Sequence, residues 1–146
     1  METTLETKTQ QGKVLYTGRT HTTGGRERGL SKSSDGHLNV NLTSPNTGGE
    51  GTNPEQLFAA AWSACFEGAL ETAARRLHVA YPEDTAIDAE IDLVLANGEY
   101  NLQARLNISL PGIDKEVARQ VVEAAQHICP YSKAIHGNVK TEYNVV

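Results

Sequence analysis

Alternating apolar and polar residues run along two neighbouring stretches of the chain and recur at its C-terminal end. A period of two is that of a β-strand with one buried face, so each stretch predicts a strand. Asn97-Gly98 separates the first two stretches and favours a tight hairpin turn between them. The predicted strands are residues 85–96, 99–110 and 138–146.

Shorter alternating stretches occupy the N-terminal third of the chain. Asp35-Gly36 lies between two of them and favours a hairpin closed by a type I′ turn. Glycine-rich segments without periodicity predict turns or loops. The predicted strands are residues 13–24, 30–34 and 37–43, and the predicted loops are residues 24–29 and 44–53.

The pattern becomes helical over residues 54–78. Pro54 suits the first turn, and the start has two alternative caps: a capping box of Thr52 with Glu55, or Asn53 alone. The first half of this segment carries almost no charge around its circumference. Such a composition predicts a helix that is buried on most of its sides.

Two further helices follow the central hairpin. Asp114 is expected to cap a helix that continues to about Ile128, and a short helix over residues 130–136 ends before Gly137. The strands come in hairpins, which predicts an α+β fold: two antiparallel or mixed sheets around the long apolar helix. Because no repeat or linker interrupts residues 1–146, a single domain is expected.

The apolar helix is difficult to cover within so small a domain. One solution is a homodimer, in which each chain covers the central helix of the other. The alternative is a monomer with both sheets wrapped around the helix. The composition of the helix favours the homodimer and leaves the monomer as the alternative.

Composition excludes several classes of protein. The 146-residue chain has a formal net charge of −5, which argues against nucleic acid as the main partner. It has no apolar stretch long enough to span a membrane. Residues 1–12 are polar, lack the apolar centre of a signal peptide and are expected to form a flexible arm. A cytoplasmic protein is therefore expected, in which a permanent structural disulfide is unusual.

Two cysteines are the candidates for chemistry. Cys65 lies within AAAWSACFEGAL, and either core packing or reactivity fits that apolar setting. Cys129 directly precedes Pro130, at or near the start of a helix, where the dipole and free N–H groups favour a thiolate. The pair is not a CxxC motif, and the five histidines are scattered, so no metal site or cofactor is expected.

Three sequence motifs, taken together, are specific enough to indicate a protein family. The stretch GGEGTNPEQLFAAAWSACFEGAL, with TGGR upstream and CPYSKAIHGN downstream, closely resembles the Ohr branch of the Ohr/OsmC family, the organic hydroperoxide resistance proteins. The resemblance runs from about Val14 to Val145 in the same order. It implies an OsmC-like, intertwined homodimer with active sites at the subunit interface. It also implies a thiol-dependent peroxidase without metal or haem.

The resemblance assigns roles to individual residues. Cys65 matches the peroxidatic cysteine and Cys129 the resolving cysteine, with which it forms a disulfide during the cycle. Arg26 and Glu55 match the residues that hold the peroxidatic thiolate, and Arg28 is a weaker competitor for the arginine role. The implied substrates are organic hydroperoxides, including those of fatty acids. The implied reductant is a dihydrolipoyl group on a lipoylated protein.

The sequence departs from the family pattern in two places. The loop SPNTGGEG is a few residues shorter than expected, which affects the entrance of the site. His136 stands where an arginine is expected before Gly137-Asn138. Neither departure touches the four matched residues.

Elementary chemistry constrains how these residues act. Burial raises the pKa of a thiol, so a buried reactive Cys65 needs a nearby cation, and Arg26 suits that role. Glu55 would orient the guanidinium. Glu55 and Cys65 are ten residues apart, about 15 Å along a straight helix. Three arrangements would still bring them into one site: the first turn of the helix bends away, Arg26 bridges the gap, or the partner subunit supplies Glu55. The partner subunit is the favoured expectation, in keeping with the interface sites that the resemblance implies.

Aromatic residues near the cysteine are candidates for contacting the alkyl chain of a substrate. Phe58, Trp62 and Phe66 form this set, with ordinary core packing as the alternative. Three other functions stay open: an OsmC-type osmotically inducible peroxidase, a non-catalytic cysteine redox sensor, and a structural α+β dimer.

Overall fold

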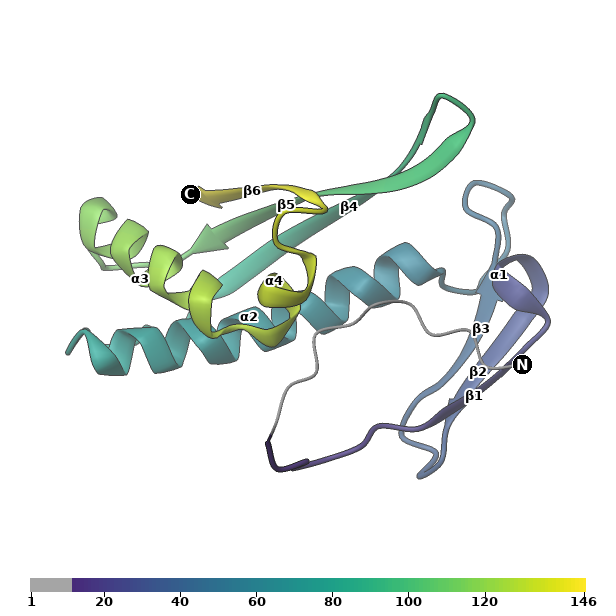
Figure 1. Ribbon diagram of the computed structural model, residues 1–146, viewed down its shortest axis with the longest axis horizontal. Helices are drawn as coiled ribbons and strands as arrows, with labels where there is room; N and C mark the ends of the chain where they lie inside the picture. The colour runs from purple at the N-terminus through teal and green to yellow at the C-terminus, as the bar shows by residue number, and fades with distance from the viewer. Residues whose placement is uncertain (1–11) are drawn as a thin grey trace. The chain divides into compact units, whose positions relative to one another are not determined.

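The computed structural model describes residues 12–146, which divide into two compact units (Figure 1). The first unit ends at Gly51, and the second runs from Thr52 to Val146. The expected flexible arm lies outside the described residues except for Gly12. The single domain stays a prediction.

The first unit is a three-stranded antiparallel sheet in the order β1-β2-β3. Residues 13–19, predicted as part of the first strand, are exposed and form no strand, since no neighbouring strand pairs with them. The loop predicted over residues 24–29 is also partly wrong, because it contains one turn of helix. The elements are β1 (Thr20–Thr23), α1 (Gly25–Arg28), β2 (Gly29–Ser33) and β3 (Asn39–Thr43).

The hairpin between β2 and β3 is confirmed, but its turn differs from the predicted type I′. That turn needs two residues with positive φ, and only Gly36 has one, at 79°. Asp35 instead accepts hydrogen bonds from Ser33 Oγ at 2.6 Å and from the backbone N–H of His37 at 3.0 Å. These bonds lower the pKa of Asp35. Hydrogen bonds to the Asp35 carboxylate therefore stabilise this turn, in place of the two positive φ angles of a type I′ turn.

The second unit combines helices with a mixed sheet in the order β4-β5-β6. β4 and β5 pair antiparallel, whereas β6 returns parallel to β5 after the chain has crossed through α3 and α4. The predicted α+β class with antiparallel or mixed sheets is confirmed. The elements are α2 (Pro54–Arg76), β4 (Ala86–Ala96), β5 (Glu99–Ser109), α3 (Lys115–Ile128), α4 (Pro130–Ile135) and β6 (Lys140–Val145).

Asn53 caps the long helix α2. Its side-chain oxygen accepts a hydrogen bond from the backbone N–H of Gln56 at 2.9 Å, as expected of an N-cap asparagine. The alternative capping box of Thr52 and Glu55 is wrong, because the Thr52 hydroxyl donates to Gln56 Oε1 at 2.8 Å. Helix α2 therefore begins at Pro54 with its first turn fixed.

The core of the second unit lies between its helices and one face of the sheet (Figure 1). Helix α2 packs against β4 and α3, and α3 reaches β6. The largest side chains with less than 2% exposure are Trp62, Phe66, Leu70, Leu106, Ile108, Val121 and Cys129. The opposite side of α2 presents small residues to solvent: Ala60, Ala61, Ala64 and Gly68. Within a single chain, the apolar helix is thus covered on one side.

The β4–β5 hairpin continues beyond this core. Its turn has positive φ at both Asn97 (52°) and Gly98 (76°), as a type I′ turn requires, so the predicted hairpin is confirmed. The hairpin end rises away from the helices in Figure 1. Leu93, Leu95 and Tyr100 near this end are 46%, 63% and 73% exposed. An apolar hairpin end without cover is typical of a surface that another chain contacts.

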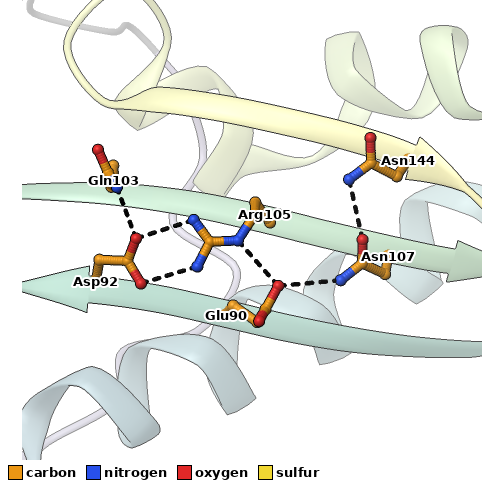
Figure 2. A network of polar contacts seen from close by, with 6 residues as sticks. All are labelled: Glu90, Asp92, Gln103, Arg105, Asn107 and Asn144. Carbon is orange, nitrogen blue, oxygen red and sulfur yellow. Dashed lines mark hydrogen bonds and ion pairs between the residues drawn. The ribbon is translucent and has the colours of Figure 1, made fainter.

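The outer face of the same sheet carries a polar network centred on Arg105 (Figure 2). Its guanidinium donates two hydrogen bonds to Asp92, both of 2.9 Å, and a third of 2.9 Å to Glu90. Gln103 adds a bond of 2.7 Å to Asp92. Chiefly because of the bonds from Arg105, the pKa of Asp92 falls to about 2. The bidentate geometry locks β4 and β5 in register.

Arg105→Met is expected to weaken the acid sensitivity of the fold. A carboxyl whose pKa is lowered on folding stabilises the protein above its unfolded pKa of about 3.9, and this contribution disappears as the pH falls toward 2. The stability gap between wild type and variant should be widest at pH 5 and close near pH 2. Urea unfolding across that range measures it. Arg119→Met, which removes an exposed pair with Glu116, is the control and should show no such trend. A gap independent of pH would contradict the assignment.

Candidate functional site: a pair of cysteines in contact

The second unit brings Cys65 and Cys129 together. Cys65 lies midway along α2, and Cys129 lies at the junction of α3 and α4. The Sγ of Cys129 lies 3.7 Å from the Sγ of Cys65, and no disulfide joins them. This is close to van der Waals contact. Two cysteines that are 64 residues apart in the sequence are thus positioned to form a bond with little rearrangement.

The backbone around Cys129 explains its position. The N–H of Cys129 donates to Ala125 O at 2.9 Å and closes α3, while its extended conformation (φ −64°, ψ 119°) turns the chain into α4. Its Sγ accepts a hydrogen bond of 3.4 Å from the backbone N–H of Ser132. Cys129 is therefore the N-cap of α4, as predicted, with Pro130 at the first helical position. Its side chain has no exposed surface.

Cys65 is only partly buried. Burial raises the pKa of its thiol, and the neighbouring Cys129 raises it further, against a smaller opposing effect from the backbone N–H of Tyr131. Since the thiolate is the nucleophilic form, these surroundings alone disfavour reactivity at neutral pH. A cation beside the sulfur would reverse the direction of the shift.

A buried polar cluster links Cys129 to the core. The Ser132 hydroxyl accepts hydrogen bonds from Trp62 Nε1 at 3.0 Å and from the Tyr143 hydroxyl at 3.1 Å. Among the described residues, Ser132 (3% exposed) and Ser31 are the polar residues classed as buried. The sequence did not single out Ser132 or Tyr143. Ser132 lies in the CPYS motif, which was the one sequence feature that could have indicated its role. Its hydrogen-bond partners Trp62 and Tyr143 are distant along the chain, so the sequence gives no sign of the cluster.

The other predicted site residues lie in both units. Arg26 is in α1 of the first unit, and Glu55, half-buried, is in the first turn of α2. Trp62 and Phe66 are fully buried, with the Tyr143 ring packed against both, an arrangement that fits the core-packing alternative. Phe58 packs edge-on against Trp62 and keeps some exposed surface.

His136, the departure from the family pattern, caps the C-terminus of α4. It lines a pocket of about 210 Å³ together with Gln126, His127 and Lys133. Among residues 12–146, no cluster of three or more histidine, cysteine or acidic side chains could hold a metal ion. The described helices include none with the length and apolar character that crossing a membrane requires.

Comparisons of the sequence with known proteins identify related proteins over most of the chain. Residues 47–144 match the sequence profile of the OsmC-like protein family. An organic hydroperoxide resistance protein of Xanthomonas axonopodis pv. citri is 41% identical over 131 residues, which span 87% of this chain and 92% of that protein.

Solved structures give the same result. The crystal structure of the organic hydroperoxide resistance protein OhrB of Bacillus subtilis superposes with a TM-score of 0.85 at 37% identity, covering 91% of this chain and all of that one. The structure of an organic hydroperoxide resistance protein from Legionella pneumophila gives 0.84 at 36% identity, covering 91% and 98% of the two chains.

Proposed function

This chain belongs to the OsmC-like protein family, and from that membership we propose that it is a thiol-dependent peroxidase that reduces organic hydroperoxides to alcohols. Relatives at about 40% identity are named organic hydroperoxide resistance proteins. The observation that carries the proposal is the 3.7 Å contact between the two cysteine sulfurs. A peroxidase of this kind needs one thiolate to attack the peroxide and a second thiol to resolve the product.

The first step takes place at Cys65, the more accessible of the two sulfurs. Its thiolate attacks one oxygen of the peroxide bond, and the O–O bond breaks. The alkoxide leaves, takes up a proton and becomes an alcohol. Cys65 is thereby oxidised to a sulfenic acid.

The second step uses the contact with Cys129. The sulfur of Cys129, on losing its proton, attacks the sulfur of the sulfenic acid, and hydroxide leaves as water after protonation. The product is a disulfide. Because disulfide sulfurs are about 2.04 Å apart, the two side chains have to approach by less than 2 Å from their present separation.

The third step restores the dithiol. Cys129 has no exposed surface, so an external thiolate reaches the disulfide at Cys65. That attack releases Cys129 as a thiol, and the second thiol of the reductant then releases Cys65. A dihydrolipoyl group on a lipoylated protein, as the family resemblance implies, would provide both thiols within one molecule.

Arg26 and Glu55 are proposed to activate the first step. The charge of Arg26 would lower the raised pKa of Cys65, and Glu55 would hold the guanidinium in place. Glu55 and Cys65 lie on one continuous helix, separated by about 15 Å of rise. We therefore assign Glu55 to the thiol of the partner subunit in a homodimer. The exposed small-residue face of α2 and the exposed end of the β4–β5 hairpin support such a dimer.

Mixed dimers test the origin of Glu55. Cys65→Ser and Glu55→Gln proteins should each have little activity, but mixing them by co-refolding should restore about a quarter of wild-type turnover. Half of the dimers would be mixed, and each of these would contain one complete site. As a control, Glu55→Gln mixed with the double variant has no intact Glu55 and should stay inactive. Failure to recover activity in the first mixture would assign Glu55 to its own chain.

Peroxide turnover tests the proposed function itself. The wild-type protein should consume cumene hydroperoxide with dihydrolipoamide as reductant, and more slowly consume hydrogen peroxide. After one equivalent of peroxide without reductant, intact mass spectrometry should show a loss of two hydrogens, the signature of a disulfide. Disulfide formation without sustained turnover would favour a redox sensor. The absence of both would leave a structural protein.

A further inference from the structure

We propose that Ser132 is a positioning residue for the resolving step: with Trp62 and Tyr143 it holds Cys129 against Cys65, so that the sulfenic acid is captured before a second peroxide oxidises it further. This inference rests on the proposed function and deepens it. It concerns residues of the second unit only.

Ser132 connects three elements at one hydroxyl. It belongs to α4, accepts the indole N–H of Trp62 from α2, and accepts the hydroxyl of Tyr143 from β6. Its own backbone N–H donates to Cys129 Sγ at 3.4 Å. The same residue therefore holds the sulfur directly and anchors its helix to the helix that carries Cys65.

Helix α4 needs such an anchor. It has six residues, from Pro130 to Ile135, and helices of this length are not stable by themselves. Its position must come from tertiary contacts, and Ser132 provides buried ones. Hydrogen bonds in a low-dielectric interior are strong and directional, so this cluster specifies one placement of α4.

The aromatic rings keep the two donors in place. Tyr143 packs on Phe66 with ring centroids 5.4 Å apart and meets Trp62 edge-on at 6.4 Å. Phe58 also meets Trp62 edge-on, with ring centroids 5.6 Å apart. Because these rings are fixed by packing, their N–H and O–H groups reach Ser132 without rotational freedom. Packing of the rings thus restricts both hydrogen-bond donors to Ser132.

The chemical consequence concerns competition between two reactions. The sulfenic acid on Cys65 either condenses with Cys129 to a disulfide and water, or a second peroxide oxidises it to a sulfinic acid while releasing a second alcohol. The first reaction is intramolecular, and its rate depends on how often the two sulfurs are in contact. Loosening α4 lowers that frequency and leaves attack of Cys65 on the first peroxide unchanged.

Ser132→Ala tests the inference. At a tenfold excess of cumene hydroperoxide, the ratio of sulfinic acid (mass gain of two oxygens) to disulfide (loss of two hydrogens) should rise at least about fivefold over wild type. The rate of the first oxidation, measured in the Cys129→Ser background with and without Ser132→Ala, should stay within about twofold. General disruption of the fold would instead lower the rate of this first oxidation.

Tyr143→Phe removes one of the two donors and keeps the ring. It should raise the sulfinic ratio in the same direction by a smaller factor, and it decides the question if Ser132→Ala does not fold. Matched controls make the same chemical changes outside the cluster. Ser63→Ala removes a hydroxyl that donates to Ala59 O, and Tyr81→Phe removes one that donates to Glu67 O. Both controls should keep the wild-type ratio.

A second oxidant separates this inference from the proposed function. Diamide converts two thiols into a disulfide without any peroxide, so it probes the sulfur contact even if wild type shows no peroxidase activity. Disulfide formation by diamide should be slower in folded Ser132→Ala than in wild type and in Ser63→Ala. A folded Ser132→Ala with the wild-type diamide rate and the wild-type sulfinic ratio would overturn the proposal. If Ser132→Ala does not fold, wild-type values for Tyr143→Phe overturn it.

Discussion

Replacing Cys65 by serine is expected to abolish peroxide turnover, with a loss of at least about a thousandfold. No other described cysteine can take over the attack, because the sulfur of Cys129 has no exposed surface. A serine hydroxyl is not ionised at neutral pH and is a poor nucleophile toward the O–O bond. Removing a nucleophile outright typically costs an enzyme most of its rate enhancement.

Cys129→Ser is the matched comparison for Cys65→Ser. This variant keeps the attacking thiol and should still react with the first equivalent of peroxide at close to the wild-type rate. Its sulfenic acid then lacks a partner, so sulfinic acid should accumulate and turnover should decline. Stopped-flow consumption of cumene hydroperoxide and intact mass spectrometry separate the two variants. Sustained turnover by Cys65→Ser would remove Cys65 from its proposed role.

Arg26→Met is expected to lower the rate of peroxide reduction at pH 7 by about a hundredfold. Without a cation, the burial of Cys65 and its neighbour Cys129 raise the thiol pKa. An unperturbed thiol is ionised to only about 3% at pH 7, and a raised pKa lowers that fraction further. The loss should therefore be a loss of thiolate, and raising the pH should recover it.

The pH profile distinguishes this cause from a structural one. In Arg26→Met, the rate should rise about tenfold per pH unit from pH 6 to the raised pKa, whereas wild type should reach its plateau at lower pH. Thiolate absorbance or alkylation rates give the pKa independently. Arg28→Met is the control, since Arg28 lies in the same short helix and was the competing candidate. If Arg28→Met shows the larger pKa change, the cation has been assigned to the wrong residue.

Local patterns predicted most of the elements because local chemistry determines them. Asn97-Gly98 adopts the two positive φ values that its composition favours, and Asp114 and Cys129 cap their helices as expected. Residues 13–19 form no strand, although their residues alternate. An alternating pattern indicates which face of a strand could be buried, but a strand also needs a neighbouring strand to pair with, and none pairs with these residues. At the start of α2 two caps were compatible with the sequence, and only the bond from Gln56 to Asn53 decides between them.

The candidate site was partly predictable for a different reason. Resemblance to a family predicted that Cys65 and Cys129 act as a pair, and the structure places their sulfurs 3.7 Å apart. Ser132 and Tyr143 were not predicted, because hydrogen bonds between residues that are distant along the chain produce no periodic pattern in the sequence. Ser132 lies 70 residues from Trp62, and Tyr143 reaches it only because β6 returns parallel to β5. The meeting of these three side chains therefore depends on the tertiary fold and not on any local sequence pattern.

The sequence separation of the two cysteines bears on the energetics of the cycle. A disulfide between them would close a loop of about 65 residues, which in the chain-entropy model stabilises the folded state by about 4 kcal/mol relative to the unfolded state. By the thermodynamic cycle, the fold stabilises the disulfide by the same amount, equivalent to about 90 mV of reduction potential. In the proposed cycle, the disulfide form would therefore resist heat better than the dithiol form. A reductant with two thiols on one molecule has the advantage against such a bond, because its second thiol completes the exchange before the mixed disulfide can revert.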